Sequence, residues 1–232
     1  ASPDESVTYP ALLGLTGLDI SDRGVTTLDG LECAQGLQIL NASGNAVGSL
    51  SPLAHLPRLF ELDISDQNIA SLTGLDALVE LRLLAARGLG LEDLSFVREM
   101  PELTSLDVAN NDITALEELS PLSHLSQLNL TNNRVEDLAP LAAGCELRIL
   151  VADGNQLSSA APLSACEDLY YLSLDENELT SLSGLEGLAS LRTLRVDDNE
   201  IEDLSPLSGL EVEELWIRSN KLQQLDPLAS VE

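Results

Sequence analysis

The chain has 232 residues, of which 44% are hydrophobic but only 3% aromatic, and it carries 39 acidic against 11 basic residues. The net charge of −28 repels phosphate backbones and anionic lipid surfaces, which argues against nucleic-acid binding and membrane-surface binding. No stretch is long and apolar enough to predict a transmembrane helix, so we expect no insertion into a membrane.

The first element in chain order is a partial N-terminal cap, predicted over residues 1–14. The stretch SPDE has the residues of a helix start, with Pro3 at the first helical position and Glu5 closing a capping box. Residues 7–14 match the second half of a repeating unit that continues through the rest of the chain. We interpret the sequence as a processed chain or as a region of a longer protein.

From residue 15 to residue 232 the sequence consists of one repeated unit. The period is 22 residues throughout, except for 21 residues between the last two copies. Apolar residues recur at positions 1, 4, 6, 11, 14, 17 and 20 of each copy, counted from its first residue. The ten copies begin at Leu15, Leu37, Leu59, Leu81, Leu103, Leu125, Leu147, Leu169, Leu191 and Val212. A fixed period of this length predicts a solenoid forming a single domain over residues 15–232.

Each copy predicts a short strand followed by a turn. Apolar and polar residues alternate around positions 3 to 7, as expected of a strand with one buried face. Position 9 is asparagine in seven copies: Asn45, Asn111, Asn133, Asn155, Asn177, Asn199 and Asn220. Because the amide both donates and accepts hydrogen bonds, we expect these side chains to pair with turn backbone groups and to form a ladder along the solenoid.

The outer side of each copy predicts a tight turn or a 3₁₀ helix. Position 16 is proline or glycine in eight copies, namely Gly30, Pro52, Gly74, Pro140, Pro162, Gly184, Pro206 and Pro227. Proline suits the first residue of a helical turn, because its missing N–H needs no partner there. Gln67 and Leu89 replace the ladder asparagine, and Phe96 and Glu118 replace the proline or glycine. The stretch 67–118 is therefore the least regular, which we interpret as drift that the neighbouring copies tolerate.

The repeated pattern LxxLxLxxNxL resembles that of the leucine-rich repeat family. The period and the endings of the form L-x-P-L are similar to the internalin-like class of bacterial surface proteins, which also has eukaryotic scaffolding relatives. The resemblance implies a right-handed horseshoe of α/β solenoid type, with a parallel β-sheet on its concave face and short 3₁₀ or helical turns on its convex face. It also implies protein recognition on the concave face.

The chain lacks the motifs of an enzyme, so we expect neither catalytic nor cofactor-binding residues and no cofactor. Its three cysteines, Cys33, Cys145 and Cys166, have no metal-ligand spacing and are predicted to be reduced, with Cys166 buried at position 20. Two Asn-x-Ser/Thr sequences, at Asn41 and Asn129, are interpreted as chance matches to glycosylation sites.

The candidate binding site comes from strand residues that should face outward. In the first half of the chain these residues are mostly small, polar or acidic, but from residue 147 they change character. The residues predicted to contact a protein partner are Ile149, Val151, Tyr171, Arg195, Trp216 and Arg218, flanked by Asp153, Asp175 and Asp197. Exposed aromatic and arginine side chains are typical of interface hot spots. A cap that covers Trp216 is the competing interpretation.

The three aspartates are predicted to form an exposed ladder on neighbouring strands about 5 Å apart. At that spacing each pair repels by roughly 1 kcal/mol in water, which a stable solenoid tolerates. No calcium ion is required, and we assign no metal site; a basic patch on the partner would suit this ladder.

These inferences predict a non-enzymatic protein-recognition module of an exported or cell-surface bacterial protein. The alternatives are a cytoplasmic scaffold or regulatory subunit, and a structural spacer within a larger surface protein. The sequence does not identify the partner or the oligomeric state.

Overall fold

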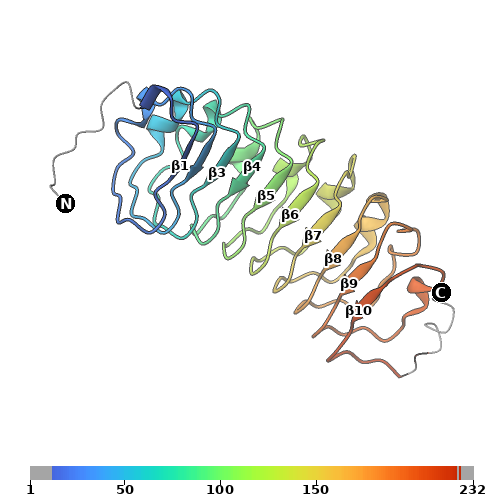
Figure 1. Cartoon of the computed structure of the whole chain (residues 1–232). Coiled ribbons are helices and arrows are strands. Elements are labelled where there is room, and N and C mark those ends of the chain that lie inside the picture. Colours follow the sequence, from blue (N-terminus) through green and yellow to red (C-terminus); the bar gives the residue numbers. More distant parts are fainter. Residues whose placement is uncertain (1–11, 224, 226–232) are drawn as a thin grey trace.

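The computed structural model describes residues 12–223 and residue 225, so the predicted capping box at Pro3 and Glu5 lies outside the described residues. Ten three-residue strands form one parallel sheet in sequence order, one strand for each repeat copy (Figure 1). We call the copies coils 1 to 10. The strands are β1 (Gly17–Asp19), β2 (Ile39–Asn41), β3 (Glu61–Asp63), β4 (Leu83–Ala85), β5 (Ser105–Asp107), β6 (Gln127–Asn129), β7 (Ile149–Val151), β8 (Tyr171–Ser173), β9 (Thr193–Arg195) and β10 (Glu214–Trp216).

Each strand pairs with the next coil in register, so that equal repeat positions are neighbours. Leu62 of β3, for example, lies between Leu40 of β2 and Leu84 of β4. The strands occupy positions 3 to 5 and are therefore shorter than the predicted range. Backbone hydrogen bonds between coils nevertheless continue beyond the ends of the strands. In coil 3, for example, Ile64 N–H donates to the Ala85 carbonyl at 2.9 Å and Asp66 N–H donates to the Arg87 carbonyl at 2.8 Å.

Short 3₁₀ helices lie on the side of the coils opposite the sheet, as predicted. They are η1 (Leu31–Cys33), η2 (Ser51–His55), η3 (Leu75–Ala77), η4 (Ser95–Val97), η5 (Glu117–Leu119), η6 (Ala139–Ala142), η7 (Ala161–Ala165) and η8 (Ser205–Leu207). Proline stands at the start of η2, η6, η7 and η8. Phe96 and Glu118 lie within η4 and η5, so their departure from the pattern does not prevent a 3₁₀ turn.

The core is a set of aliphatic columns between the sheet and the 3₁₀ helices. In coil 8 all of the repeated apolar positions are fully buried: Leu169, Leu172, Leu174, Leu179, Leu182, Leu185 and Leu188. Burying one such side chain stabilises the fold by roughly 1.5–3 kcal/mol, and each coil completes its burial only by stacking on its neighbours. The repetition is therefore what gives the chain a continuous core.

The predicted asparagine ladder is present. Asn155 donates from Nδ2 to the carbonyls of Leu130 and Ala152 at 3.0 and 3.1 Å, and its Oδ1 accepts from Val135 N–H at 3.0 Å. One side chain thus satisfies backbone groups of its own coil and of the preceding coil. The same pattern recurs at the other six ladder asparagines.

The ladder is interrupted in coils 3 and 4. Gln67 takes the asparagine role, because its Nε2 donates to the Ile64 carbonyl and its Oε1 accepts from Val47 N–H. Leu89 has no polar group and packs against the core instead. In the described part of the chain, Asn68 N–H and Gly90 N–H also lack the bond that Asp112 N–H makes to the preceding coil. The irregularity predicted for residues 67–118 thus includes the turns of coils 3 and 4.

Position 8 has a left-handed backbone in all ten coils, a feature that we did not predict. Glycine occupies it at Gly44, Gly88 and Gly154, and elsewhere it is aspartate, asparagine, glutamate or serine, namely Asp22, Asp66, Asn110, Asn132, Glu176, Asp198 and Ser219. Glycine, asparagine and aspartate tolerate a positive φ best, so this composition was a readable signal. The sharp turn after each strand depends on it.

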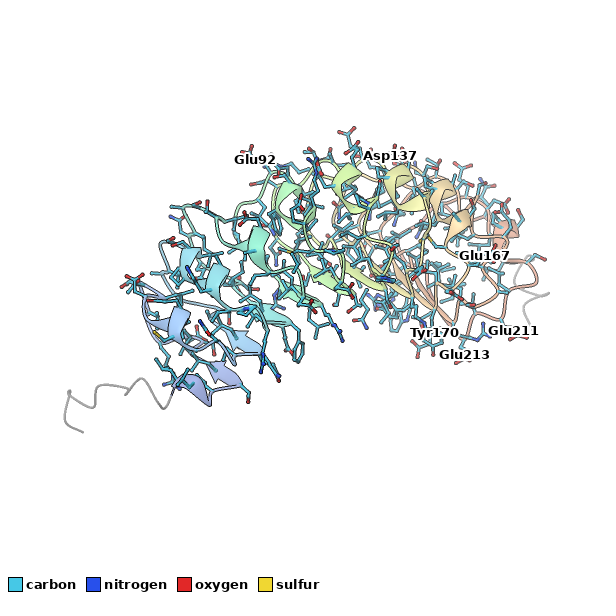
Figure 2. The ribbon with its side chains drawn as sticks, turned by 90° about the horizontal axis from the view of Figure 1, so that it is seen from above. Glu92, Asp137, Glu167, Tyr170, Glu211 and Glu213 are labelled. Carbon is cyan, nitrogen blue, oxygen red and sulfur yellow. A yellow bond between two sulfur atoms is a disulfide. The ribbon has the colours of Figure 1, made fainter. Side chains whose placement is uncertain are left out.

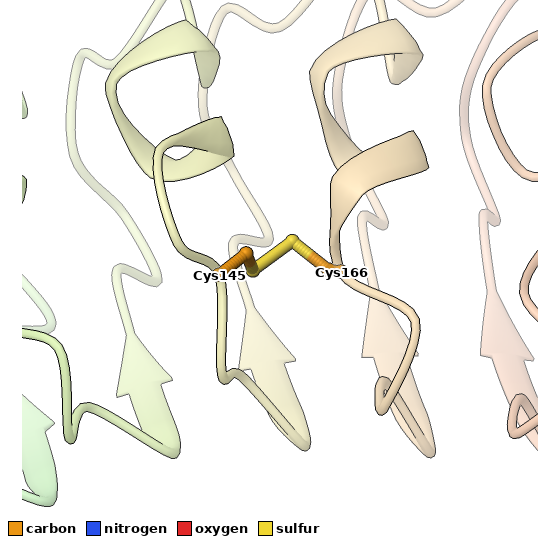
Figure 3. Close-up of a disulfide and its surroundings, with 2 residues drawn as sticks. All are labelled: Cys145 and Cys166. Carbon is orange, nitrogen blue, oxygen red and sulfur yellow. A yellow bond between two sulfur atoms is a disulfide. The ribbon is translucent and has the colours of Figure 1, made fainter.

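The prediction of three reduced cysteines is wrong. Cys166 is buried as expected, but it forms a disulfide with Cys145 of the preceding coil (Figure 3). Their separation of 21 residues is one less than the repeat period, so stacking brings their Cα atoms to 4.9 Å. The signal in the sequence is this spacing, because residues separated by about one period lie side by side on neighbouring coils. Cys33 remains free.

Candidate protein-binding site

All nine predicted site residues come together on the concave face of coils 7 to 10. Ile149 of β7 pairs with Tyr171 of β8, and Arg195 of β9 pairs with Trp216 of β10. The three aspartates and Arg218 stand at position 7 of the same coils, two residues after position 5. The register therefore joins residues that are up to 69 positions apart in the sequence into one surface, which we call the C-terminal patch.

Trp216 is the most exposed apolar side chain of the C-terminal patch, with 37% of its surface accessible. Two guanidinium groups lie over its ring, those of Arg195 at 5.1 Å and Arg218 at 5.0 Å from the ring centroid. Cation–π contacts of this kind contribute about 0.5–2 kcal/mol each. Trp216 is therefore held by its neighbours in the sheet while a large part of its surface stays open to solvent.

Arg195 is also fixed by a carboxylate. Its Nη2 and Nε donate to Asp175 Oδ2 at 2.6 and 3.0 Å. The hydrogen bonds to this carboxylate raise the pKa of Arg195 above its usual value. Arg218 differs, because within the described residues its guanidinium has the Trp216 ring as its only contact. No hydrogen bond or ion pair occupies the guanidinium donors of Arg218 in the described part of the chain.

The aspartates do not form the exposed, repelling ladder that we predicted. Asp175 is buried, and each of the three carboxylates accepts a backbone N–H from the next coil. The acceptor distances are 2.9 Å from Asp175 N–H to Asp153, 2.7 Å from Asp197 N–H to Asp175, and 2.6 Å from Arg218 N–H to Asp197. These bonds offset the repulsion, so the aspartates support the sheet as well as bordering the patch.

Asp153 is half-buried and accepts two hydrogen bonds. Burial raises the pKa of Asp153, although its carboxylate also accepts from the Ser173 hydroxyl at 2.7 Å. Asp175 nearby adds to the increase by repulsion between the two carboxylates. The carboxylate of Asp153 is therefore held inside the concave surface at some electrostatic cost.

The different residues at position 5 of coils 9 and 10 have a structural explanation. In coils 1, 2, 3, 5 and 6 the side chain at position 5 accepts the N–H of position 7 in its own coil, and these side chains are Asp19, Asn41, Asp63, Asp107 and Asn129. In coils 8 to 10 the aspartate of the preceding coil accepts that N–H instead. Position 5 is thereby released from capping and can carry Arg195 and Trp216.

The same capping explains the two Asn-x-Ser/Thr sequences. Asn41 Oδ1 accepts from the Ser43 hydroxyl at 2.7 Å, and Asn129 Oδ1 accepts from the Thr131 hydroxyl at 2.7 Å. An asparagine at position 5 and a hydroxyl residue at position 7 are thus a structural pair in these two coils. The pairing accounts for the sequences without glycosylation.

Sequence reasoning missed a second feature of the concave face. An open hollow of about 380 Å³ lies over β2 to β6, and we call it the N-terminal hollow. It forms where position 5 of coil 4 is the small Ala85, between Asp63 and Asp107 of the neighbouring strands. The only alanine among the position-5 residues of the ten coils was the signal that could have located it.

In the described ranges, no group of three His, Cys, Asp or Glu side chains lies close enough to hold a metal ion. A search over the same residues finds no helix with the length and hydropathy needed to cross a membrane.

Comparison with known proteins agrees with this architecture. A family model described as leucine-rich repeats in two copies matches residues 101–143. The chain has the leucine-rich-repeat fold. No curated protein sequence is significantly similar to it. Solved structures of other leucine-rich-repeat proteins share its fold, and they confirm the predicted resemblance to the internalin-like class.

Internalin C2 of Listeria monocytogenes is 28% identical, with a TM-score of 0.78 over 82% of this chain and 84% of that chain. A leucine-rich-repeat protein of Leptospira interrogans is 21% identical, with a TM-score of 0.77 over 94% of this chain and 64% of that one. The ectodomain of the plant receptor kinase GASSHO1/SCHENGEN3 of Arabidopsis thaliana, solved in complex with CASPARIAN STRIP INTEGRITY FACTOR 2, is 21% identical. Its TM-score is 0.72 over 93% of this chain, which spans 28% of that ectodomain.

Proposed function

We propose that this leucine-rich-repeat protein is a non-enzymatic recognition module that binds a protein partner through the C-terminal patch. The observation that carries the proposal is the transfer of backbone capping from position 5 to the aspartates of the preceding coils. Arg195 and Trp216 therefore do not have to accept the backbone N–H of position 7. The guanidinium of Arg218 has hydrogen-bond donors that no described residue occupies. Rigid aromatic surface and directed arginine donors are the groups that dominate protein interfaces.

The apolar part of the patch fits the same role. Val151 and Tyr171 are half-buried in neighbouring strands, next to Ile149, and none of the three is required by the aliphatic core behind the sheet. An interface centre of this kind excludes water around the arginine contacts and strengthens them. The plant ectodomain with the same fold, which was solved with its partner, gives a further reason to expect a binding role.

We also propose that the protein is exported or displayed on a cell surface. The Cys145–Cys166 disulfide supports this, because disulfides persist in oxidising compartments and are rare in the cytosol. The resemblance to internalin C2 points in the same direction. A partner with a basic patch would complement a chain of net charge −28.

The test is the affinity of the intact chain for a partner recovered by pull-down, measured by calorimetry. Tyr171→Ala and Trp216→Ala should each weaken binding by about 2 kcal/mol, or about thirtyfold, without much loss of stability. Tyr170→Ala is the matched control, because Tyr170 is 52% exposed but lies on the lateral edge near Glu213 (Figure 2).

The two variants and the control separate the alternatives. If Tyr171→Ala and Trp216→Ala bind like the parent while Tyr170→Ala loses affinity, the contact lies on the lateral edge and the concave proposal is wrong. If all three bind like the parent, the C-terminal patch does not contribute to recognition.

A further inference from the structure

The N-terminal hollow has an apolar floor that stays open to solvent. Ile39 and Leu83 are 39% and 37% exposed, which is unusual among the large hydrophobic residues of the chain. Both stand at position 3, on β2 and β4, with Glu61 of β3 paired to each of them. Between neighbouring strands the spacing is about 4.8 Å, so the two aliphatic side chains flank one carboxylate. An elongated aliphatic group can lie along this floor.

The rim of the hollow is acidic. Glu61, Asp63 and Asp107 are the charged residues that line it, and no basic residue lines it. The carboxylate of Glu61 has no hydrogen-bond or ion-pair partner within the described residues, although the Glu61 backbone N–H donates to the Gln38 carbonyl. Its carboxylate is therefore free to accept hydrogen bonds from a ligand.

Arg87 only partly neutralises this rim. Its guanidinium lies 3.6 Å from a carboxylate oxygen of Asp63 and 3.6 Å from one of Asp107. These distances are longer than the roughly 2.7–2.9 Å of a charge-assisted hydrogen bond, so both carboxylates keep capacity for a better donor. One arginine beside three carboxylates leaves a net negative charge around the hollow. The complementary group is a cation.

We propose that the N-terminal hollow binds a lysine or arginine side chain from a basic segment of a protein partner. The aliphatic stem of such a side chain would lie on Leu83 and Ala85, and its charged head would reach the carboxylates of Glu61 and the two aspartates. The volume of about 380 Å³ lies within the range of ligand pockets, about 300–1,000 Å³. This surface goes beyond the proposed function, because it shares no residue with the C-terminal patch.

The three carboxylates are spread over β3 and β5, and no group of three acidic side chains in the described part of the chain is close enough for a metal ion. A side chain that extends across several strands can satisfy them where a single ion cannot. Geometry therefore favours a long organic cation over a divalent metal.

The experiment is methyl NMR on the full chain, following the signals of Ile39 and Leu83. The probe is the peptide acetyl-Val-Arg-Val-amide, and its counterpart carries uncharged citrulline in place of arginine. We expect saturable shifts with the arginine peptide and about tenfold weaker binding with the citrulline peptide, since the charged hydrogen bonds are lost. Glu61→Gln should weaken binding of the arginine peptide in the same direction.

Ala85→Leu fills the hollow and should abolish these shifts, whereas the same substitution at the exposed Ala189 is the matched control and should leave them intact. Trp216→Ala should also leave them intact, which separates this proposal from the proposed function. Equal affinity of the two peptides, or persistent binding in Ala85→Leu, would overturn the proposal. So would stronger saturable shifts of the same methyl signals with calcium chloride than with the arginine peptide.

Discussion

Asn155 connects the turns of two neighbouring coils, because its amide bonds backbone groups of both. Replacing it with leucine keeps the size of the side chain but leaves buried carbonyls and an N–H unpaired. Asn155→Leu should lower the free energy of unfolding by roughly 1–3 kcal/mol. Urea denaturation measures this, and Gln156→Leu at the exposed neighbouring position is the control that should change little. An unchanged midpoint for Asn155→Leu would contradict the role of the ladder.

The second prediction at this scale concerns the pH dependence of Asp153. Because burial raises the pKa of Asp153 above the ordinary value of 3.8, the folded protein keeps its proton to higher pH than the unfolded chain does. The carboxylate therefore lowers stability at neutral pH, and this loss disappears as the pH falls below the unfolded pKa. Asp153→Asn keeps an oxygen acceptor for Ser173 and Asp175 N–H without the charge.

We expect Asp153→Asn to raise the free energy of unfolding at pH 7 and to have a smaller effect at pH 3, because the cost of the charge is present only where the carboxylate is ionised. Chemical denaturation at both values measures the difference, with the exposed Asp168→Asn as control. A less stable variant at pH 7 would mean that attraction to Arg195 outweighs the burial of the charge.

At the scale of elements, the disulfide joins two coils that otherwise share only packing and hydrogen bonds. It closes a loop of 21 residues between Cys145 and Cys166. Constraining a loop of this length in the unfolded chain stabilises a protein by about 3 kcal/mol in the chain-entropy model. The double variant Cys145→Ala with Cys166→Ala should lose about that much, as measured by denaturation without reductant.

Cys33→Ala is the control for this experiment, because Cys33 is free and should contribute nothing that depends on oxidation. Adding reductant should destabilise the parent and the Cys33→Ala variant alike, and should leave the double variant unchanged. Equal stability of the parent with and without reductant would contradict a stabilising role of the bond.

Strands, 3₁₀ turns and the asparagine ladder were predictable because each depends on residue types that recur at fixed positions. The transfer of backbone capping to the aspartates of the preceding coils was not predictable. Asp153 and Asp175 accept a backbone N–H of the following coil, and the sequence does not mark that N–H. For the same reason the aspartates were expected to be exposed. The N-terminal hollow depends on the small side chain of Ala85, which has no functional group to mark it in the sequence.

For the whole molecule, the net charge of −28 makes repulsion between carboxylates a general cost of folding. Salt screens interactions between exposed charges beyond a Debye length of about 10 Å at 0.1 M. Raising sodium chloride from low to moderate concentration should therefore raise the Tm, by roughly 2–4 °C for each kcal/mol of repulsion removed. Calorimetric scans measure this. A Tm that falls with salt would mean that ion pairs such as Arg195 with Asp175 outweigh the general repulsion.

The solenoid could be predicted from the sequence because its period and apolar positions persist over ten copies. The partner could not, because concave residues are free of the core and no rule of packing selects them. The two surfaces on that face illustrate the difference. Trp216 was predicted as a site residue because the core gives no reason for a large residue there, whereas the hollow is marked in the sequence only by one small residue, Ala85.

The linear order of the sheet has a mechanical consequence. Since each coil bonds only to the coils before and after it, a force applied to the two ends would detach the terminal coils first and then proceed inward. Each released coil of 22 residues would lengthen the chain by roughly 75 Å. At the disulfide the unravelling would reach a covalent stop, and the residues between Cys145 and Cys166 would not extend. Under tension the bond would hold coils 6 and 7 together, between the half of the molecule that contains the hollow and the half that contains Trp216.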